Sequence, residues 1–251
     1  VSEGYCADGF IPTKNADGTY GVKEGTYVAE TGGVYYESLQ AAIDAAPRKG
    51  TVKLLADTRE NVTINTPYLT LDLNGHTLNS DAGIIRIGSD DASKAFGKLI
   101  LTGEGDLLKL NNSHTVCIMV ENGALATDGW NGRMDDLLIT SDGASVQLSG
   151  GTFGKIGNGT AAITLGGLLA DGYAFRNFDG EAIGRSEEIV QNGAITNLAV
   201  ARCVQHKAAS ANDPCIYCGT NDYIAQMVVD GKTTYYTDLQ AALNAAKAGD
   251  T

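Results

Sequence analysis

The chain has little of what several common classes of protein require. Among its 251 residues are one tryptophan, four prolines and five phenylalanines, and 18 Lys and Arg stand against 30 Asp and Glu. The basic residues are scattered, whereas a nucleic-acid backbone or an anionic membrane surface is bound by a basic patch. No apolar run approaches the roughly 18 residues that span a bilayer. The sequence therefore predicts no nucleic-acid partner and no membrane insertion.

Glycine, by contrast, is abundant, and the hydrophobic fraction is large enough for a core. The chain contains 32 glycines, and 43% of its residues are hydrophobic. Many glycines beside few large aromatics indicate short strands joined by tight turns rather than long packed helices. The length suits one large domain or two modest ones.

One segment of the chain occurs twice. VYYESLQAAIDAA covers residues 34–46, and TYYTDLQAALNAA covers residues 234–246. Similarity over so long a run indicates tandem repetition of one structural unit. We therefore expect four parts: the tail of a preceding unit at 1–26, a β-helix unit at 27–200, a Cys-rich knuckle at 201–220 and the start of a following unit at 221–251.

The repeated segment predicts a short helix, at 38–46 in the first copy. Ser38 and Asp238 are suitable N-cap residues, because each side chain can accept a hydrogen bond from a first-turn amide. One apolar face follows the helical i, i+3, i+4 and i+7 pattern at Leu39, Ala42, Ile43 and Ala46. We expect this face to pack against the open end of a β-rich unit as its cap.

The stretch between the two copies is rich in strand signals. Short alternating runs of Val, Ile, Leu and Thr are each closed by Gly, Asn or Asp. Glycines of NG, EG, NG and DG pairs recur at about the length of one solenoid coil, at Gly75, Gly105, Gly123 and Gly143. This pattern predicts a parallel β-solenoid over about 51–169, with these glycines at left-handed corners. A β-sandwich also has short strands and frequent turns, but the coil-length spacing and the preceding helix favour the solenoid.

The segments YYESLQAAIDAA, TVKLLAD, LTLDLNGHTL, LSGGTF and LLADGYAF, within roughly 27–180, resemble right-handed parallel β-helix modules of the pectate-lyase-like kind. Modules with these sequence motifs are similar to parts of large repetitive surface proteins of Gram-positive gut and oral bacteria. The resemblance implies a mainly β fold, a secreted and cell wall-associated location, and a non-catalytic role as a stalk or adhesin. The implied partners are neighbouring repeats and a host glycan or host surface protein.

Four metal-binding residues cluster in the sequence CVQHKAASANDPCIYCG. Cys203-x2-His206 and Cys215-x2-Cys218 together make a Cys3His set with the spacing of a tetrahedral zinc site. The connector KAASANDP is small and polar and has no core of its own, so metal binding would supply folding free energy. Because four protein ligands leave no position for water, we expect structural rather than catalytic zinc. The stretch also resembles the zinc knuckles that join repeats in such surface proteins.

Disulfides are the competing reading of the same stretch, since thiols pair in a secreted chain. Cys203 could pair with Cys215 or Cys218, and the third thiol would then need Cys6 or Cys117. Reduced thiols without metal are the remaining alternative. Cys117 lies in the apolar run TVCIMV, where we expect a buried small hydrophobe.

The alternative function is a carbohydrate-active enzyme, a polysaccharide lyase or a glycoside hydrolase. Such enzymes need facing carboxylates, and the candidates are Asp90–Asp91, Asp135–Asp136 and Glu187–Glu188. Adjacent strand residues point to opposite faces, so a pair of acidic neighbours is not by itself a site. We expect His76 and His114 to be turn residues rather than general bases.

An exposed aromatic side chain offers a binding alternative. Trp130 lies in the polar, glycine-flanked sequence DGWNGRMDD, where it could stack on a sugar. Neighbouring polar side chains could then bind sugar hydroxyls, and the candidates are Asp128, Asn131, Arg133 and Asp135. The competing reading folds Trp130 back onto the side of the solenoid.

Overall fold

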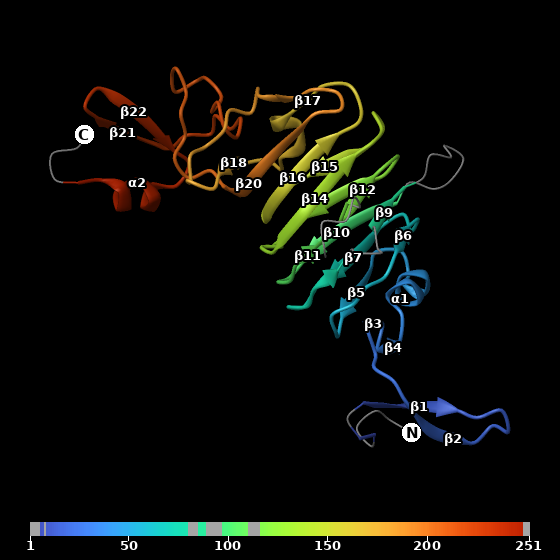
Figure 1. Cartoon of the computed structure of the whole chain (residues 1–251). Helices are drawn as coiled ribbons and strands as arrows, with labels where there is room; N and C mark the ends of the chain where they lie inside the picture. The colour runs from blue at the N-terminus through green and yellow to red at the C-terminus, as the bar shows by residue number, and fades with distance from the viewer. Residues whose placement is uncertain (1–5, 8, 80–84, 89–96, 110–115, 248–251) are drawn as a thin grey trace.

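The computed structural model describes residues 6–7, 9–79, 85–88, 97–109 and 116–247 (Figure 1). The fold is mainly β, as predicted, and the described residues contain two α-helices of seven residues each. No helix among them is long and apolar enough to cross a membrane. The candidates Asp90, Asp91 and His114 lie outside the described residues.

The centre of the molecule is a β-solenoid of about four turns, with two parallel sheets (Figure 1). The first sheet contains β5 (Gly50–Leu54), β7 (Leu69–Asp72), β10 (Lys98–Thr102), β13 (Ala124–Thr127) and β15 (Ser145–Gln147). The second contains β6 (Val62–Ile64), β9 (Ile85–Ile87), β12 (Ile118–Val120), β14 (Arg133–Ile139) and β16 (Thr152–Asn158). Two short strands extend the second sheet, β8 (Leu78–Asn79) and β11 (Leu107–Leu108).

Inward side chains stack from coil to coil and form the core. In the register of the first sheet Val52 pairs with Leu71, and Leu71 pairs with Leu101. Ile87 and Val120 pair in the same way in the second sheet, and all five side chains are fully buried. Because each such side chain contributes about 1.5–3 kcal/mol on burial, these columns hold the coils together.

The predicted glycine corners are only half right. Gly75 and Gly105 have positive φ angles of 82° and 129°, as a left-handed corner requires. Gly123 and Gly143 do not have positive φ, so the expectation for them is wrong. Gly123 is instead required by close packing, because an added Cβ would lie 2.8 Å from the carbonyl oxygen of Gly97 in the preceding coil.

Helix α1 (Leu39–Ala45) covers the first coil, which confirms the predicted capping helix. Ser38 is its N-cap, and the Ser38 hydroxyl accepts a hydrogen bond from the amide of Ala41 at 3.3 Å. The predicted apolar face is buried at Leu39, Ala42, Ile43 and Ala46. Before the helix, β3 (Ala29–Thr31) and β4 (Val34–Tyr36) form a hairpin, and β3 pairs antiparallel with β5.

The Gln40 side chain closes the edge of the second sheet. Its Oε1 accepts a hydrogen bond from the backbone N–H of Thr63 at 2.8 Å, and its Nε2 donates to the Thr63 carbonyl at 3.3 Å. Glu60 also accepts the backbone N–H of Leu39 at 2.8 Å, which fixes the start of the helix. Since unpaired strand edges invite pairing with other chains, the hairpin and Gln40 together protect both edges of the first coil.

Antiparallel strands follow the last coil. Strand β20 (Ala194–Arg202) pairs antiparallel with β16, and β18 (Tyr173–Asn177) pairs antiparallel with β20. In the chain, β17 (Ile163–Thr164) and a 3-10 helix (Leu165–Leu168) lie between β16 and β18, and β19 (Glu188–Ile189) lies between β18 and β20. The change of strand direction ends the parallel stack.

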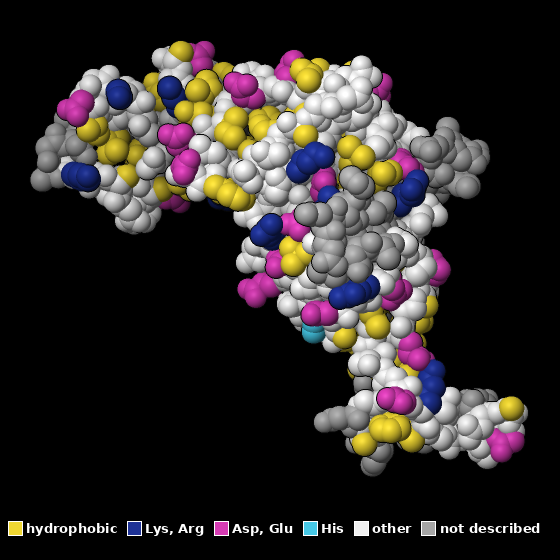
Figure 2. Space-filling model, viewed as in Figure 1, with side chains coloured by type: hydrophobic (Ala, Val, Ile, Leu, Met, Phe, Trp, Pro, Cys, Tyr) yellow, Lys and Arg dark blue, Asp and Glu magenta, His cyan; other side chains and the backbone are white. Residues whose placement is uncertain are grey.

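A hairpin lies at each end of the molecule (Figure 1). One contains β1 (Phe10–Lys14) and β2 (Tyr20–Glu24), and the other contains β21 (Ala225–Val229) and β22 (Lys232–Tyr236). Helix α2 (Leu239–Ala245) follows the second hairpin, and its N-cap Asp238 accepts the amide of Ala241 at 2.7 Å. The second copy of the repeated segment thus folds like the first, but its Leu239 and Leu243 are 56% and 59% exposed. Figure 2 shows hydrophobic side chains at the surface of this end of the molecule.

Candidate metal centre

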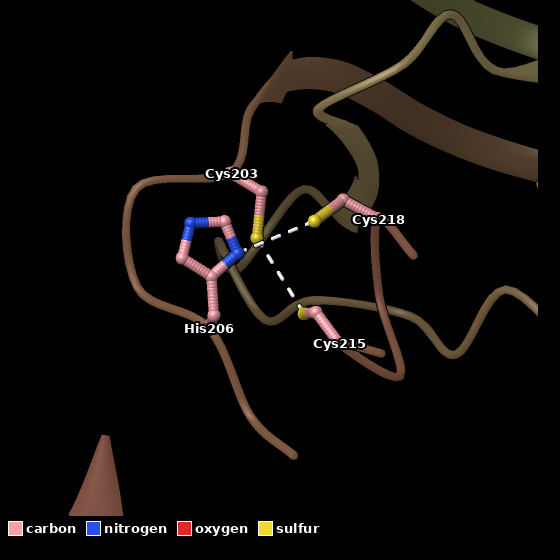
Figure 3. A group of neighbouring side chains, drawn as sticks. All are labelled: Cys203, His206, Cys215 and Cys218. Atoms are coloured by element: carbon pink, nitrogen blue, oxygen red, sulfur yellow. Dashed lines mark hydrogen bonds between the residues drawn. The ribbon is translucent and has the colours of Figure 1, made fainter. Parts of the chain in front are cut away.

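The four residues of the Cys3His motif come together in a small cluster. Cys203 directly follows β20, His206 pairs with Tyr235 in an isolated antiparallel bridge, and Cys215 and Cys218 come from a tight loop farther along (Figure 3). Their ligand atoms all lie within 4.8 Å of one another, and all four residues are buried. The cluster can hold a metal ion.

The distances within the cluster suit tetrahedral coordination. The sulfurs of Cys203 and Cys215 are 4.0 Å apart, and Cys218 Sγ lies 3.3 Å from Nδ1 of His206. Metal–sulfur bonds of about 2.3 Å place tetrahedral sulfurs about 3.8 Å apart. A disulfide would need about 2.05 Å, and no described cysteine is in a disulfide. The geometry therefore favours a metal site over the disulfide alternative.

Local backbone structure explains why the second pair of ligands converges. The amide of Gly219 donates to the carbonyl of Cys215 at 2.8 Å, and the amide of Tyr217 points at Cys215 Sγ from 3.4 Å. Gly219 has a φ of 81°, which a side chain would disfavour. An amide directed at a thiolate orients the ligand and stabilises its charge, so the loop is arranged for thiolate ligands.

Hydrogen bonds between the thiols set their proton affinities. The hydrogen bond that the Cys203 thiol donates to Cys215 raises the pKa of Cys203, and the contact with Cys218 and burial raise it further. Acceptance of the hydrogen bond from Cys203 lowers the pKa of Cys215. The pKa of Tyr223 is raised to about 12, by burial first and then by the charge of Cys215 and its neighbours. The cluster thus favours a thiolate, the form that binds metal.

The cluster contacts elements that precede it and elements that follow it in the chain. It packs on Ala174 of β18, at the end of the solenoid. On the other side the backbone of His206 makes two hydrogen bonds with Tyr235 of β22, at 2.8 and 2.9 Å. The ring of Tyr223 stacks on Tyr235 with centroids 4.9 Å apart. The candidate metal centre therefore lies between the solenoid and the second hairpin.

Sequence reasoning missed one cationic neighbour of the cluster. An added Cβ at Gly219 would lie 1.3 Å from Nη1 of Arg185, so the guanidinium covers the residue that follows ligand Cys218. The backbone of Arg185 donates to the carbonyl of Ile216 at 2.9 Å, inside the Cys215–Cys218 loop. A divalent metal ion bound by three thiolates and a neutral His would carry one net negative charge, which a nearby cation would offset. Nothing in the local sequence around Arg185 signals this contact.

Of the two readings of Trp130, the exposed sugar platform is wrong, and the structure agrees with the one that folds Trp130 back onto the solenoid. Trp130 is 1% exposed, its indole N–H donates to the carbonyl of Gly105 at 2.9 Å, and its ring meets Phe153 edge-on. The space for the indole comes from Gly151, where an added Cβ would lie 2.1 Å from the ring. Trp130 is therefore a core residue and offers no face for a sugar.

The polar residues grouped with Trp130 remain at the surface without an aromatic platform. Asp128 and Asn131 are exposed, and Arg133 forms an ion pair with Asp135 at 2.7 Å. Asp135 also accepts the backbone N–H of Lys109 at 2.8 Å. Arg133 and Asp135 thus each have a partner within the protein.

The described carboxylate candidates differ in their surroundings. Glu187 and Glu188 are exposed, whereas Asp136 is 5% exposed and lies 3.3 Å from Nζ of Lys109. Oδ1 of Asp136 has no hydrogen-bond partner among the described residues. Nδ1 of His76 lies 3.4 Å from Oδ1 of Asp57 at a coil corner, and Cys117 is buried as expected.

No protein-family model, curated protein or solved structure matches the chain. The β-solenoid, its duplicated cap and the Cys/His cluster are therefore the features from which a function is inferred.

Proposed function

We propose that the chain is a non-catalytic repeat module of a secreted bacterial cell-surface protein. It would serve as a stalk or as a face that binds a host glycan or host surface protein. The observation that carries the proposal is the duplicated hairpin and helix, once as the cap of a solenoid and once beyond the metal centre. Capped solenoids joined in a linear series form an extended structure. Such a structure suits a surface stalk or binding face better than it suits catalysis in an enclosed pocket.

The apolar side chains of the two helices support this proposal, because they are buried in the first copy and exposed in the second. Leu39 and Ile43 of the first helix are 0% and 1% exposed, because they cover the first coil. The equivalent Leu239 and Leu243 keep the same apolar character at 56% and 59% exposure. An apolar face without an apolar neighbour is unfavourable, so we infer that α2 caps a further solenoid in an array.

We propose Zn²⁺ as the metal of the Cys203, His206, Cys215 and Cys218 cluster. Zinc prefers tetrahedral sulfur and nitrogen ligands, and four protein ligands leave no position for a reacting water. The apolar core around the cluster is small, consisting of Ala174 and the three cysteines with two tyrosines against them. Metal binding would supply the folding free energy that this core lacks, so the zinc would be structural.

Intact mass tests the metal directly. Under native conditions the protein should exceed its denatured mass by one zinc, and all thiols should be alkylated after denaturation. A denatured mass short by about two hydrogens per cysteine pair would instead establish disulfides. Cys215→Ser should lose the zinc, whereas Cys6→Ser, outside the cluster, should retain it.

A carbohydrate-active enzyme is the second candidate, and one observation favours it. Asp136 is buried, its Oδ1 has no hydrogen-bond partner among the described residues, and its Oδ2 lies 3.3 Å from Nζ of Lys109. Glycoside hydrolases use carboxyl groups as general acid, base or nucleophile. Incubation with plant, mucin and glycosaminoglycan polysaccharides separates the two candidates. Retention without new chain ends supports the adhesin, and no interaction at all supports a pure stalk. New reducing or unsaturated ends that disappear in Asp136→Asn would establish the enzyme.

A further inference from the structure

Thr237 belongs to the second hairpin and helix, yet its hydroxyl reaches the metal centre. We propose that Thr237 is a positioning residue that orients His206 for the metal, so that metal binding and docking of the second hairpin are coupled. This inference rests on the proposed metal site. It assigns part of that site to the segment that follows it in the chain.

The two ring nitrogens of His206 face in different directions. Nδ1 lies 3.3 Å from Cys218 Sγ, within the group of ligand atoms. Nε2 lies 3.3 Å from Oγ1 of Thr237, outside that group. The imidazole thus spans the distance from the thiol cluster to the N-terminal end of α2, where Thr237 precedes the N-cap Asp238.

The chemistry of imidazole makes this contact directional. A metal on Nδ1 requires the neutral ring to carry its proton on Nε2, and that N–H then needs an acceptor. The Thr237 oxygen is the acceptor that the structure provides. Metal-binding histidines are generally held by such a partner on the second nitrogen, which fixes the tautomer and the ring angle.

Backbone contacts hold Thr237 in place for this role. The amide of His206 donates to the Tyr235 carbonyl at 2.8 Å, and the amide of Tyr235 donates to the His206 carbonyl at 2.9 Å. The ring of Tyr223 lies 5.5 Å from the His206 ring and stacks on Tyr235. The hairpin therefore contacts the ligand through its main chain, its aromatic rings and the Thr237 hydroxyl.

The first copy of the repeat uses the same position differently. Glu37 is the counterpart of Thr237, and it forms an ion pair with Lys23 of the preceding hairpin at 2.5 Å. Position 37 and position 237 thus each connect a hairpin and helix to the segment before it. In the first copy the connection is an ion pair, and in the second it is a hydrogen bond to a metal ligand.

Coupling through a shared contact is reciprocal. If docking of the hairpin orients His206, metal binding must favour the docked hairpin by the same factor. Removal of the metal should then loosen β21 and β22 more than the parallel strands of the solenoid, because β22 is hydrogen-bonded to the backbone of ligand His206.

Zinc affinity, measured by chelator competition on the full chain, tests the role of Thr237. Thr237→Val should weaken zinc binding about 10–100-fold, the usual effect of losing such a partner, and Thr237→Ser should restore affinity to within about threefold. Glu37→Gln, the matched change in the first copy, should leave zinc affinity unchanged. Nitrogen-15 NMR gives a second readout, because the Nε2 proton of His206 should be slow to exchange in the zinc-loaded wild type and fast in Thr237→Val.

The outcomes separate this inference from the proposed site. If the wild type binds zinc and Thr237→Val binds it equally, with the same Nε2 proton exchange, the positioning role is wrong. If amide exchange in β21 and β22 is the same with and without zinc, the coupling is wrong. If the wild type binds no zinc, the metal site itself fails, and this inference fails with it.

Discussion

Gln40 and Gln240 occupy the same position in two copies of one helix, but only Gln40 has a strand edge to close. Both side chains donate to the residue four positions on, Gln40 to Asp44 at 2.8 Å and Gln240 to Asn244 at 2.9 Å. Only Gln40 also pairs with the N–H and C=O of Thr63. Comparing the two alanine substitutions therefore isolates the contact with the sheet.

The expected cost follows from the two hydrogen bonds. Each contributes about 0.5–1.5 kcal/mol net, and Thr63 is only partly buried, so water replaces part of the loss. Gln40→Ala should therefore lower the free energy of unfolding by about 1–2 kcal/mol more than Gln240→Ala does. For a chain of this size that difference corresponds to a Tm lower by about 2–8 °C.

Amide hydrogen exchange at Thr63 gives the local measurement, and denaturant unfolding gives the global one. In Gln40→Ala the Thr63 amide should exchange markedly faster, while core amides such as Leu71 should follow only the global loss. Gln40→Glu keeps the acceptor and loses the donor, so it should fall between wild type and alanine. Equal losses of stability in Gln40→Ala and Gln240→Ala, with Thr63 exchange unchanged, would refute the edge-closing role.

Three further predictions use other parts of the molecule. Leu39→Ala should cost about 2–5 kcal/mol of unfolding free energy, whereas Leu239→Ala, at a 56% exposed position, should change it by less than about 0.5 kcal/mol in denaturant titrations. Gly219→Ala should lower zinc affinity in chelator competition, because the new methyl group would collide with Arg185 at a left-handed backbone position. The raised pKa of Tyr223, about 12 against the ordinary 10, means that the unfolded chain loses this proton first. The free energy of unfolding should therefore fall as the pH rises from about 10 to 12. In the Tyr223→Phe variant it should fall less steeply over that interval.

Periodic and closely spaced features of the sequence were predictable. The capping helix follows from apolar spacing and from Ser38, and the metal cluster follows from two ligand pairs that each lie within one turn. The solenoid follows from alternating strands and coil-length spacing. In each case the signal lies within a few residues, or repeats at a regular interval, so the chain reveals it without knowledge of its tertiary contacts.

Contacts between coils were not predictable from local pattern. Trp130 lies in a polar, glycine-rich sequence typical of an exposed loop, yet Gly151 from the following coil makes a slot for its ring. Gly123 resembles a corner glycine, but its role is to let the backbone of Gly97 approach closely. Thr237 carries no signal at all, because its contact depends on where the second hairpin docks. Sequence patterns identify the coils, but only the stacked structure shows which side chains and backbone segments of neighbouring coils come into contact.

The distribution of apolar side chains fits the proposed zinc site beside the second hairpin. The solenoid is held by long columns of buried Leu, Ile and Val, but the core at the second hairpin is small. Structural zinc contributes about 10–16 kcal/mol to folding in small zinc-binding peptides, more than this small core can supply. Loss of the metal should therefore free the second hairpin and α2 while the solenoid stays folded. In an array of such modules, the metal centre would set the angle between one solenoid and the next.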